Sequence, residues 1–137
     1  MKCPFAAPML KTTAACRHAR EVVRRGGSEF DCQSDVEHAR CEQVFAGLKA
    51  SALAVSSIED DPAQMPHSLL VKIQSGGLLG VQRLLGEPDA DGRVADVGDL
   101  LTRACTHFGG ADRIPYAALT EDMTAFKLER RAGRRRG

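Results

Sequence analysis

Residues 34–56 read SDVEHARCEQVFAGLKASALAVS and carry the clearest structural pattern in the chain. Ser34, followed by Glu37 three residues later, forms a capping box, the arrangement that satisfies the free N–H groups at a helix start. Behind it, apolar residues recur at helical spacing at Val44, Phe45, Leu48, Ala52 and Val55. The stretch therefore predicts a long helix that begins at Ser34 and ends at about Ser56.

Further helices are expected on both sides of this one. Residues 10–25 are expected to form the first helix, because Gly26 and Gly27 suit the left-handed geometry found after helix C-termini. The remaining helices are expected over residues 67–85, from Asp96 or Asp99 to Phe108-Gly109-Gly110, and from Pro115 onward with Leu119, Met123 and Phe126 on one face.

The segment 67–85 is strongly apolar but is interrupted by Gly76, Gly77 and Gly80. Because glycine costs roughly 1 kcal/mol relative to alanine inside a helix, this helix is expected to have a weak or kinked centre. Close approach of a neighbouring helix is the preferred explanation for the glycines. A strand–turn–strand arrangement over Leu70–Val81 is the alternative.

Composition favours helices over strands. The chain has 137 residues, of which 43% are hydrophobic and only 4% aromatic, with no Trp. A core built from Leu, Val, Ala, Met and Phe suits helices better than aromatic-rich strands. We therefore expect an all-α fold, a single-domain bundle of about five helices with an irregular N-terminal arm. The domain is expected over residues 1–129, with a metal-site region at 1–45 and a basic tail at 130–137.

The sequence also bears on the compartment. No apolar stretch approaches the roughly 20 residues that a membrane span needs, and Pro4, Pro8 and Lys11 interrupt anything resembling a secretion signal. The expected location is therefore the cytoplasm. In a reducing compartment structural disulfides are disfavoured, so five cysteines in a short chain indicate metal or redox chemistry.

Four of the cysteines lie within the first 41 residues, at the spacing Cys-x12-Cys-x15-Cys-x8-Cys. These are Cys3, Cys16, Cys32 and Cys41. They are expected in the arm, in the first helix, in the loop after it and two turns into the second helix. Thiols from these segments could converge on one point, and the sequence therefore predicts a metal site on these four residues.

The spacing favours an iron–sulphur cluster over a zinc ion. Structural zinc sites usually use close Cys-x2–4-Cys pairs, and none is present. A cubane cluster is wider, and each thiolate binds a different iron, so its ligands can come from separate segments. We expect one 4Fe–4S cluster, with zinc as the alternative metal. The remaining alternative is no metal, with the cysteines as small buried apolar residues.

Two further residues, His38 and Cys105, could take part in this site. His38 precedes Cys41 by three residues and shares its side of the helix, so it is a candidate substitute ligand or hydrogen-bond donor to a ligand sulphur; a surface position is the alternative. A catalytic Cys41–His38 pair lacks an orienting acid and an oxyanion donor, so we expect no enzyme activity. Cys105 is expected to be an ordinary core residue.

The chain end is basic although the formal net charge is only +1. Its cations are Lys127, Arg130, Arg131, Arg134, Arg135 and Arg136. A solvated terminus and a docking segment for an acidic partner or nucleic acid are both open, but the scarcity of aromatics argues against single-strand nucleic-acid binding.

Two functions follow from these observations. The first is an electron carrier or accessory subunit of a redox enzyme, with one cluster and a redox protein as its partner. The alternative is a non-redox interaction module that holds structural zinc or no metal and binds an acidic protein or nucleic acid through its basic tail.

Overall fold

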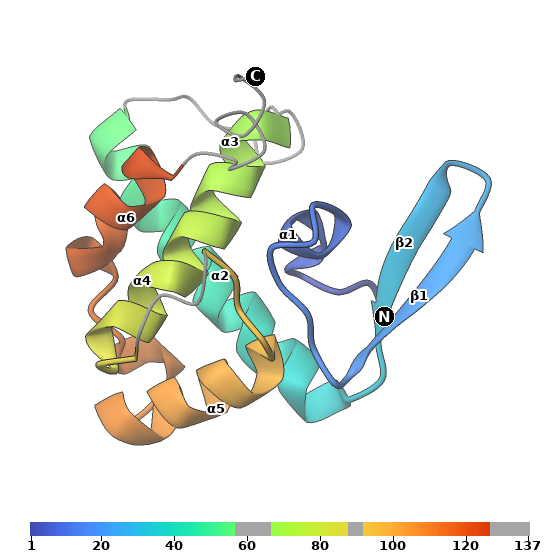
Figure 1. Ribbon diagram of the computed structural model, residues 1–137. Helices are drawn as coiled ribbons and strands as arrows, with labels where there is room; N and C mark the ends of the chain where they lie inside the picture. Colours follow the sequence, from blue (N-terminus) through green and yellow to red (C-terminus); the bar gives the residue numbers. More distant parts are fainter. Residues whose placement is uncertain (57–66, 88–91, 127–137) are drawn as a thin grey trace.

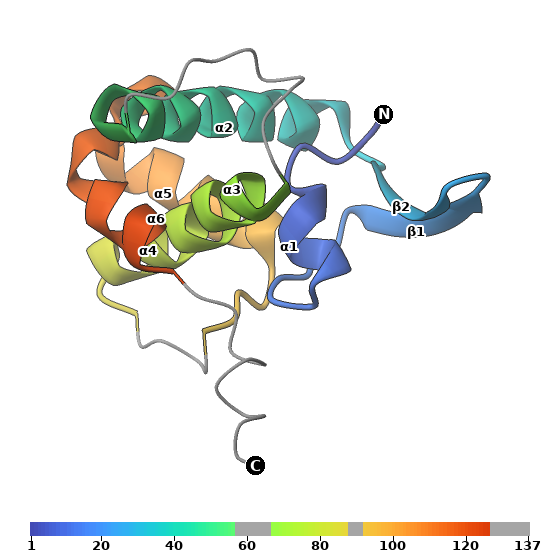
Figure 2. The ribbon, with the colours of Figure 1, turned by 90° about the horizontal axis from the view of Figure 1, so that it is seen from above.

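The computed structural model of the chain describes residues 1–56, 67–87 and 92–126. Helices gather on one side of the molecule, and a β-hairpin projects from them on the other (Figure 1). Figure 2 shows the same separation from above, with α1 lying between the hairpin and the longer helices. The elements are, in order, α1 (Ala6–Leu10), β1 (Ala19–Arg24), β2 (Gly27–Cys32), α2 (Asp35–Ser56), α3 (His67–Val71), the π-helix η2 (Lys72–Gly76), α4 (Gly77–Leu84), α5 (Val97–Phe108), η3 (Ala111–Arg113), η4 (Tyr116–Leu119) and α6 (Thr120–Ala125).

The hairpin overturns the prediction of an all-α fold. β1 and β2 pair as an antiparallel two-stranded sheet, from Ala19 opposite Cys32 to Arg24 opposite Gly27. The segment 10–25, expected as the first helix, instead contains the end of α1, a loop and β1. The fold is therefore mostly helical with a small sheet.

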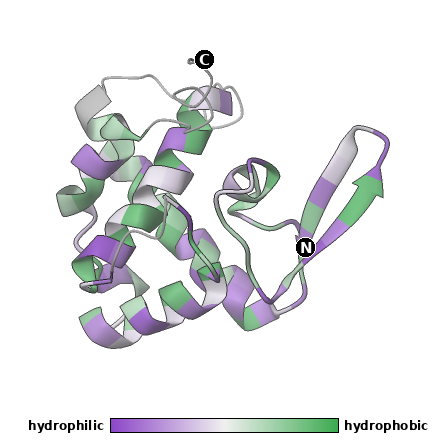
Figure 3. Ribbon diagram, viewed as in Figure 1, coloured by the Kyte–Doolittle hydropathy of each residue, from purple (hydrophilic) through white to green (hydrophobic). Residues whose placement is uncertain are grey.

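Local chemistry explains why this segment is a hairpin. Val22 and Val23 are β-branched and favour extended backbone. Gly27 has φ of +115°, so the glycine pair closes a turn between strands instead of ending a helix. Across the strands, the Arg24 guanidinium lies 2.8 Å from the Glu29 carboxylate and 2.9 Å from that of Asp31. Both strands contain a mixture of hydrophobic and hydrophilic residues (Figure 3).

The N-terminal arm is more regular than expected. Lys2 forms an antiparallel bridge with Asp31, which extends the pairing of the hairpin beyond its two strands. The one-turn helix α1 follows and includes Pro8, which is tolerated because a first helical turn needs no N–H donor at that position. Phe5 and Met9 are buried at 0% and 5% exposure, so this helix is anchored to the core.

The N-cap of α2 at Ser34 is confirmed, whereas the Glu37 carboxylate accepts a hydrogen bond from Arg40 at 2.6 Å. The backbone N–H of Glu37 donates to the Ser34 hydroxyl at 3.3 Å. Three of the expected apolar residues, Val44, Leu48 and Ala52, are at most 4% exposed, whereas Phe45 is half-buried. The side chain of Val55 lies outside the described residues. The helix ends at Ser56, as predicted from the sequence.

The segment 67–85 is one continuous helical rod, and the strand–turn–strand alternative is wrong. The rod consists of α3, η2 and α4, and the expected weak centre is the π-helical turn η2. A π-turn has i→i+5 hydrogen bonds and is uncommon outside functional sites. Residues 73–78 are buried without interruption, because other elements surround this part of the rod.

The glycines of this rod allow close packing, as expected. A Cβ atom at Gly76 would lie 2.5 Å from the carbonyl oxygen of Asp122 in α6. One at Gly77 would lie 2.7 Å from a Leu48 methyl group, and one at Gly80 would lie 2.8 Å from Leu119. The rod therefore contacts α2 and the C-terminal helical turns at distances that a side chain would prevent.

The remaining helices agree with their sequence signals. Asp96 caps α5 by accepting a hydrogen bond from the Asp99 N–H, and Gly109 ends the helix with φ of +97°. Leu119 and Met123 are buried at 0% and 1% exposure. The expected face is therefore confirmed at both positions, while Phe126 follows α6 and is half-buried.

The prediction of a basic tail at 130–137 lies outside the described residues. In the part of the chain that the structure describes, no helix combines the length and apolar character needed to cross a lipid bilayer.

Candidate metal centre

The four N-terminal cysteines come from four different parts of the fold. Cys3 lies in the arm before α1, Cys32 is the last residue of β2, and Cys41 lies in the second turn of α2. Cys16 was expected inside a helix but lies in the loop that enters β1. It is therefore placed by backbone contacts of that loop and not by a helix of its own.

Backbone hydrogen bonds fix two of these cysteines on neighbouring extended segments. The N–H of Cys3 donates to the carbonyl of Phe30 at 2.9 Å, and the N–H of Cys32 donates to the carbonyl of Met1 at 2.6 Å. The arm thus runs alongside β2, and Cys3 and Cys32 lie on adjacent backbone segments.

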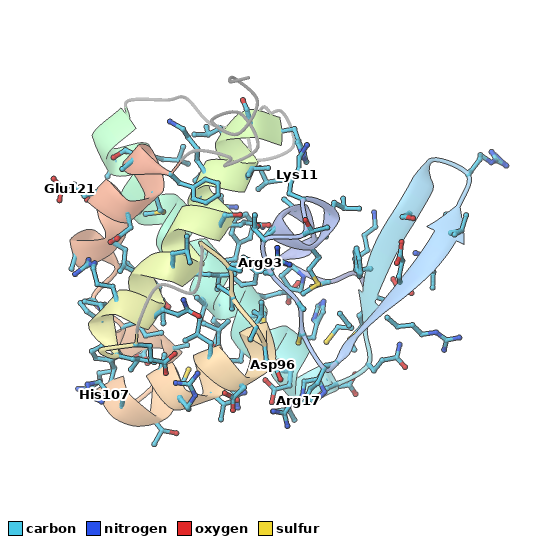
Figure 4. All side chains as sticks on the ribbon, in the orientation of Figure 1. Lys11, Arg17, Arg93, Asp96, His107 and Glu121 are labelled. Carbon is cyan, nitrogen blue, oxygen red and sulfur yellow. The ribbon has the colours of Figure 1, made fainter. Side chains whose placement is uncertain are left out.

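The loop that carries Cys16 is attached to the start of α5. The N–H of Ala15 donates to the carbonyl of Val94 at 3.0 Å, and the N–H of Val97 donates to the carbonyl of Ala15 at 2.8 Å. Next to them, the Arg17 guanidinium lies 2.7 Å from the Asp96 carboxylate. Figure 4 shows these two side chains together at the base of the hairpin, where α5 begins.

Electrostatics indicates that the four thiols are neighbours. Burial raises the pKa of the Cys41 thiol, and negative charge at Cys3, Cys16 and Cys32 raises it further. Burial raises the pKa of Cys3 to about 11, with smaller contributions from Cys16 and Cys32. A thiolate raises another pKa only over a short distance in a protein. The structure therefore brings the four predicted residues into one region.

Backbone N–H groups point at two of the sulphurs. The N–H of His18 donates to Cys16 Sγ at 3.5 Å, and the backbone at Gly98 also stabilises the thiolate, although burial still raises the pKa of Cys16 overall. The backbone at Phe5 does the same for Cys3. Hydrogen bonds to ligand sulphur are one of the means by which proteins set cluster potentials.

His38 contacts the arm that carries Cys3. Its Nε2 lies 3.0 Å from the carbonyl oxygen of Lys2, the residue before Cys3. Its Nδ1 lies 3.7 Å from the Glu42 carboxylate. The ring therefore lies beside the arm, and its role as a substitute ligand or hydrogen-bond donor stays a prediction.

Cys105 lies apart from this group. It is half-buried on α5, packed against the core, and burial raises its pKa. The charges that affect it belong to Arg40, Glu37 and Asp112, and none of the four N-terminal cysteines is among them.

The thiols are free, but their side chains form no compact metal-binding group. All five cysteines are unpaired with one another. Among the described residues, no three His, Cys, Asp or Glu side chains are arranged to hold one metal ion.

Two hollows give solvent a route to the region. One of about 640 Å³ reaches Cys16 between Met9, Phe30 and Val94. Another of about 390 Å³ reaches Cys3 beside Phe45 and Lys49. The hairpin and the body thus leave two of the sulphurs accessible, whereas Cys41 is 6% exposed.

Sequence reasoning missed the residues that support Cys16. A Cβ atom at Gly98 would lie 3.2 Å from Cys16 Sγ and 3.0 Å from the His18 ring. Gly98 is separated from Cys16 by 82 positions of chain, so spacing alone could not reveal the contact. The only available signal was a glycine in the first turn of a helix, where a better helix former is usual.

Comparisons with known proteins add no further assignment. No protein-family model, no curated protein and no solved structure matches this chain. The class that fold and site define is therefore a mostly helical protein with a projecting hairpin and four neighbouring thiols at their junction.

The metal-free protein is expected to lose stability at alkaline pH. The pKa of Cys3 is about 11 in the folded state against an ordinary value of 9.0, so the folded state keeps its proton where the unfolded state has lost it. The protonated Cys3 thiol therefore contributes to folding stability below pH 9.0, and this contribution is lost as the pH rises through about 11. Denaturant unfolding between pH 8 and 11 should show a steeper decline for the wild type than for Cys3→Ser. Equal slopes would contradict the pKa of Cys3.

Proposed function

We propose that this chain is an iron–sulphur protein that holds one 4Fe–4S cluster on Cys3, Cys16, Cys32 and Cys41. The observation that carries the proposal is that negative charge at Cys3, Cys16 and Cys32 raises the pKa of Cys41, and that at Cys16 and Cys32 raises the pKa of Cys3. The four thiols come from four segments separated along the chain, and electrostatic coupling between them requires that the fold gather them.

The surroundings of the thiols support the same proposal. The thiols are free of disulfide bonds, and backbone donors at Phe5, His18 and Gly98 partly offset the burial that raises the pKa values of Cys3 and Cys16. These donors favour the thiolate form that a metal needs. When bound, a cluster supplies one-electron transfer. The chain's residues would hold it, donate hydrogen bonds to its sulphur ligands and bury the Cys41 side from water.

An electron carrier or accessory subunit is a better proposal than an enzyme. The Nε2 of His38 lies 3.0 Å from the Lys2 carbonyl oxygen, so this ring nitrogen is turned toward the arm. The hollows beside Cys3 and Cys16 would let a redox partner approach the cluster. The alternative, an interaction module that uses the tail at 130–137, depends on residues outside those described and gains no support here.

Anaerobic metal and sulphide analysis tests the proposal. The full chain, purified without oxygen and reconstituted with iron and sulphide, is expected to hold about four iron and four sulphide ions with visible absorbance that bleaches on reduction. One zinc ion per chain without sulphide would establish the zinc alternative. A colourless chain that takes up no iron would refute the cluster.

Gly98→Ala should weaken the centre without unfolding the chain. The added methyl group would lie 3.2 Å from Cys16 Sγ and 3.0 Å from the His18 ring, so these two side chains must move slightly away from α5. We expect cluster loss to chelator or air to accelerate by roughly tenfold, the lower end of the effect of residues that support metal ligands. Gly26→Ala is the control, because nothing lies within 4 Å of its Cβ position. Equal rates of loss would show that Gly98 does not position Cys16.

A further inference from the structure

The π-helical turn η2 places two buried polar side chains toward the segments that carry cysteines. Gln74 and Ser75 are each 2% exposed, in the middle of the rod. Buried polar groups cost free energy unless they are hydrogen-bonded. Their hydrogen-bond partners therefore indicate what this turn does.

Gln74 binds the arm next to Cys3. Its Nε2 donates to the carbonyl oxygen of Pro4 at 2.6 Å, and Pro4 directly follows Cys3. The Oε1 of the same amide is buried and has no hydrogen-bond partner. An amide kept at this cost, with its donor on the residue beside a cysteine, indicates that holding the arm is its main contact.

Ser75 binds the loop that leads to Cys16. Its Oγ lies 3.1 Å from the Thr13 hydroxyl, three residues before Cys16. The N–H of Thr13 also donates to the carbonyl of Pro8 at 2.9 Å, which fixes the loop against α1. Two consecutive residues of one turn thus bind the segments of two different cysteines.

The turn is a rigid base for these contacts. Directly after Ser75, Gly76 packs against the backbone of Asp122 and Met123 so closely that a Cβ atom would lie within 2.7 Å of both. The rod therefore has little freedom to move relative to α6. π-turns are frequent at functional sites, where they aim side chains that a regular helix would place elsewhere.

We propose that Gln74 and Ser75 are positioning residues for the metal centre: Gln74 sets Cys3 through Pro4, and Ser75 sets Cys16 through Thr13. The inference rests on the proposed function for the identity of the group that is bound. The two tethers themselves can be tested without any metal.

Site-resolved alkylation of the metal-free, reduced full chain tests the tethers. Iodoacetamide is the probe, and peptide mass spectrometry gives the labelling rate of each cysteine. Gln74→Met is expected to accelerate labelling of Cys3 by about fivefold, the effect of losing one net hydrogen bond, and to leave Cys16 near the wild-type rate. Ser75→Ala is expected to accelerate labelling of Cys16 by about the same factor and to leave Cys3 near the wild-type rate.

Matched variants separate positioning from general destabilisation. Gln82 is another buried glutamine of the same rod, 8% exposed, and its Nε2 has no hydrogen-bond partner; Gln82→Met should change neither rate. Thr13→Val removes the contact with Ser75 and also the hydrogen bond from the Thr13 hydroxyl to the Pro8 carbonyl at 3.2 Å, so it should accelerate labelling of Cys16 at least as much as Ser75→Ala. Thr13→Ser keeps the hydroxyl and should retain the wild-type rate. Cys41, which is buried, reports global unfolding. If Gln74→Met accelerates labelling of Cys41, that variant has unfolded, and the Ser75 and Thr13 variants then test the tethers.

The reconstituted protein gives the second readout. Gln74→Met and Ser75→Ala should each shift the reduction potential or the electron paramagnetic resonance spectrum of the cluster, and Gln82→Met should not. Unchanged labelling and an unchanged spectrum in both variants would overturn the positioning role. Selective labelling in a chain that takes up no cluster would instead keep the tethers and refute the proposed function.

Discussion

Cys3→Ser and Cys41→Ser should each abolish most iron and sulphide binding. Both thiols belong to the group whose charges affect one another, and a serine hydroxyl is a much weaker ligand for iron than a thiolate. Changes to residues that only support ligands cost 10–100-fold in metal affinity, so loss of a ligand should cost at least about 100-fold. Iron, sulphide and visible absorbance after anaerobic reconstitution provide the measurement.

Cys105→Ser is the matched control for both variants. Cys105 is a free thiol like the others but lies on α5 and does not affect the pKa of Cys41. It should bind iron as the wild type does. Cys3 is the more informative position of the two, because it lies in the arm and its replacement disturbs the core less than that of Cys41, which is 6% exposed. Full iron content in Cys3→Ser would remove this residue from the ligand set.

Elements with local signals could be predicted from the sequence. The Ser34–Glu37 capping box gave the start of α2, and the Gly109 C-cap gave the end of α5. In these cases the hydrogen bonds join residues a few positions apart. The rod over 67–85 also has a local signal in its sequence. Its glycines indicate close packing, but they do not identify the element that packs against them.

The hairpin was missed because its signal also fits a helix end. Gly26 and Gly27 can end a helix in left-handed geometry or close a turn between two strands. The contacts that decide between them are non-local. Lys2 pairs with Asp31, and the N–H of Cys32 bonds to the carbonyl of Met1. No pattern within residues 10–25 records that the arm will lie beside β2.

The candidate site also has a part that the sequence predicts and a part that it does not. The four cysteines could be named as a set because residue type and compartment limit their chemistry, and their ligand role stays a prediction. The residues that support them could not be named. Gln74 contacts Pro4 from 70 positions away, and Asp96 contacts Arg17 from 79. Tertiary packing alone creates these contacts.

Gly76→Ala should be the most destabilising glycine substitution in the rod. Its Cβ atom would lie 2.5 Å from the carbonyl oxygen of Asp122 and 2.7 Å from the Cα of Met123. Both atoms belong to the backbone of α6, so no side chain can rotate away and the helices must separate. Overpacking costs about 1–3 kcal/mol and sometimes more, while alanine returns up to about 1 kcal/mol of helix propensity. We expect a net loss of about 2 kcal/mol or more in the free energy of unfolding.

Gly77→Ala and Gly26→Ala make this prediction specific. At Gly77 the obstacle is the Leu48 side chain, which can change rotamer, so a smaller loss is expected; at Gly26 nothing lies within 4 Å, so stability should change by less than about 0.5 kcal/mol. Urea unfolding of the three variants gives the order directly. Because Gln74 and Ser75 precede Gly76 on the same turn, Gly76→Ala should also loosen the tethers to Pro4 and Thr13. A Gly76→Ala protein as stable as the wild type would mean that α6 can withdraw freely, and the turn could not then serve as a rigid base for Cys3 and Cys16.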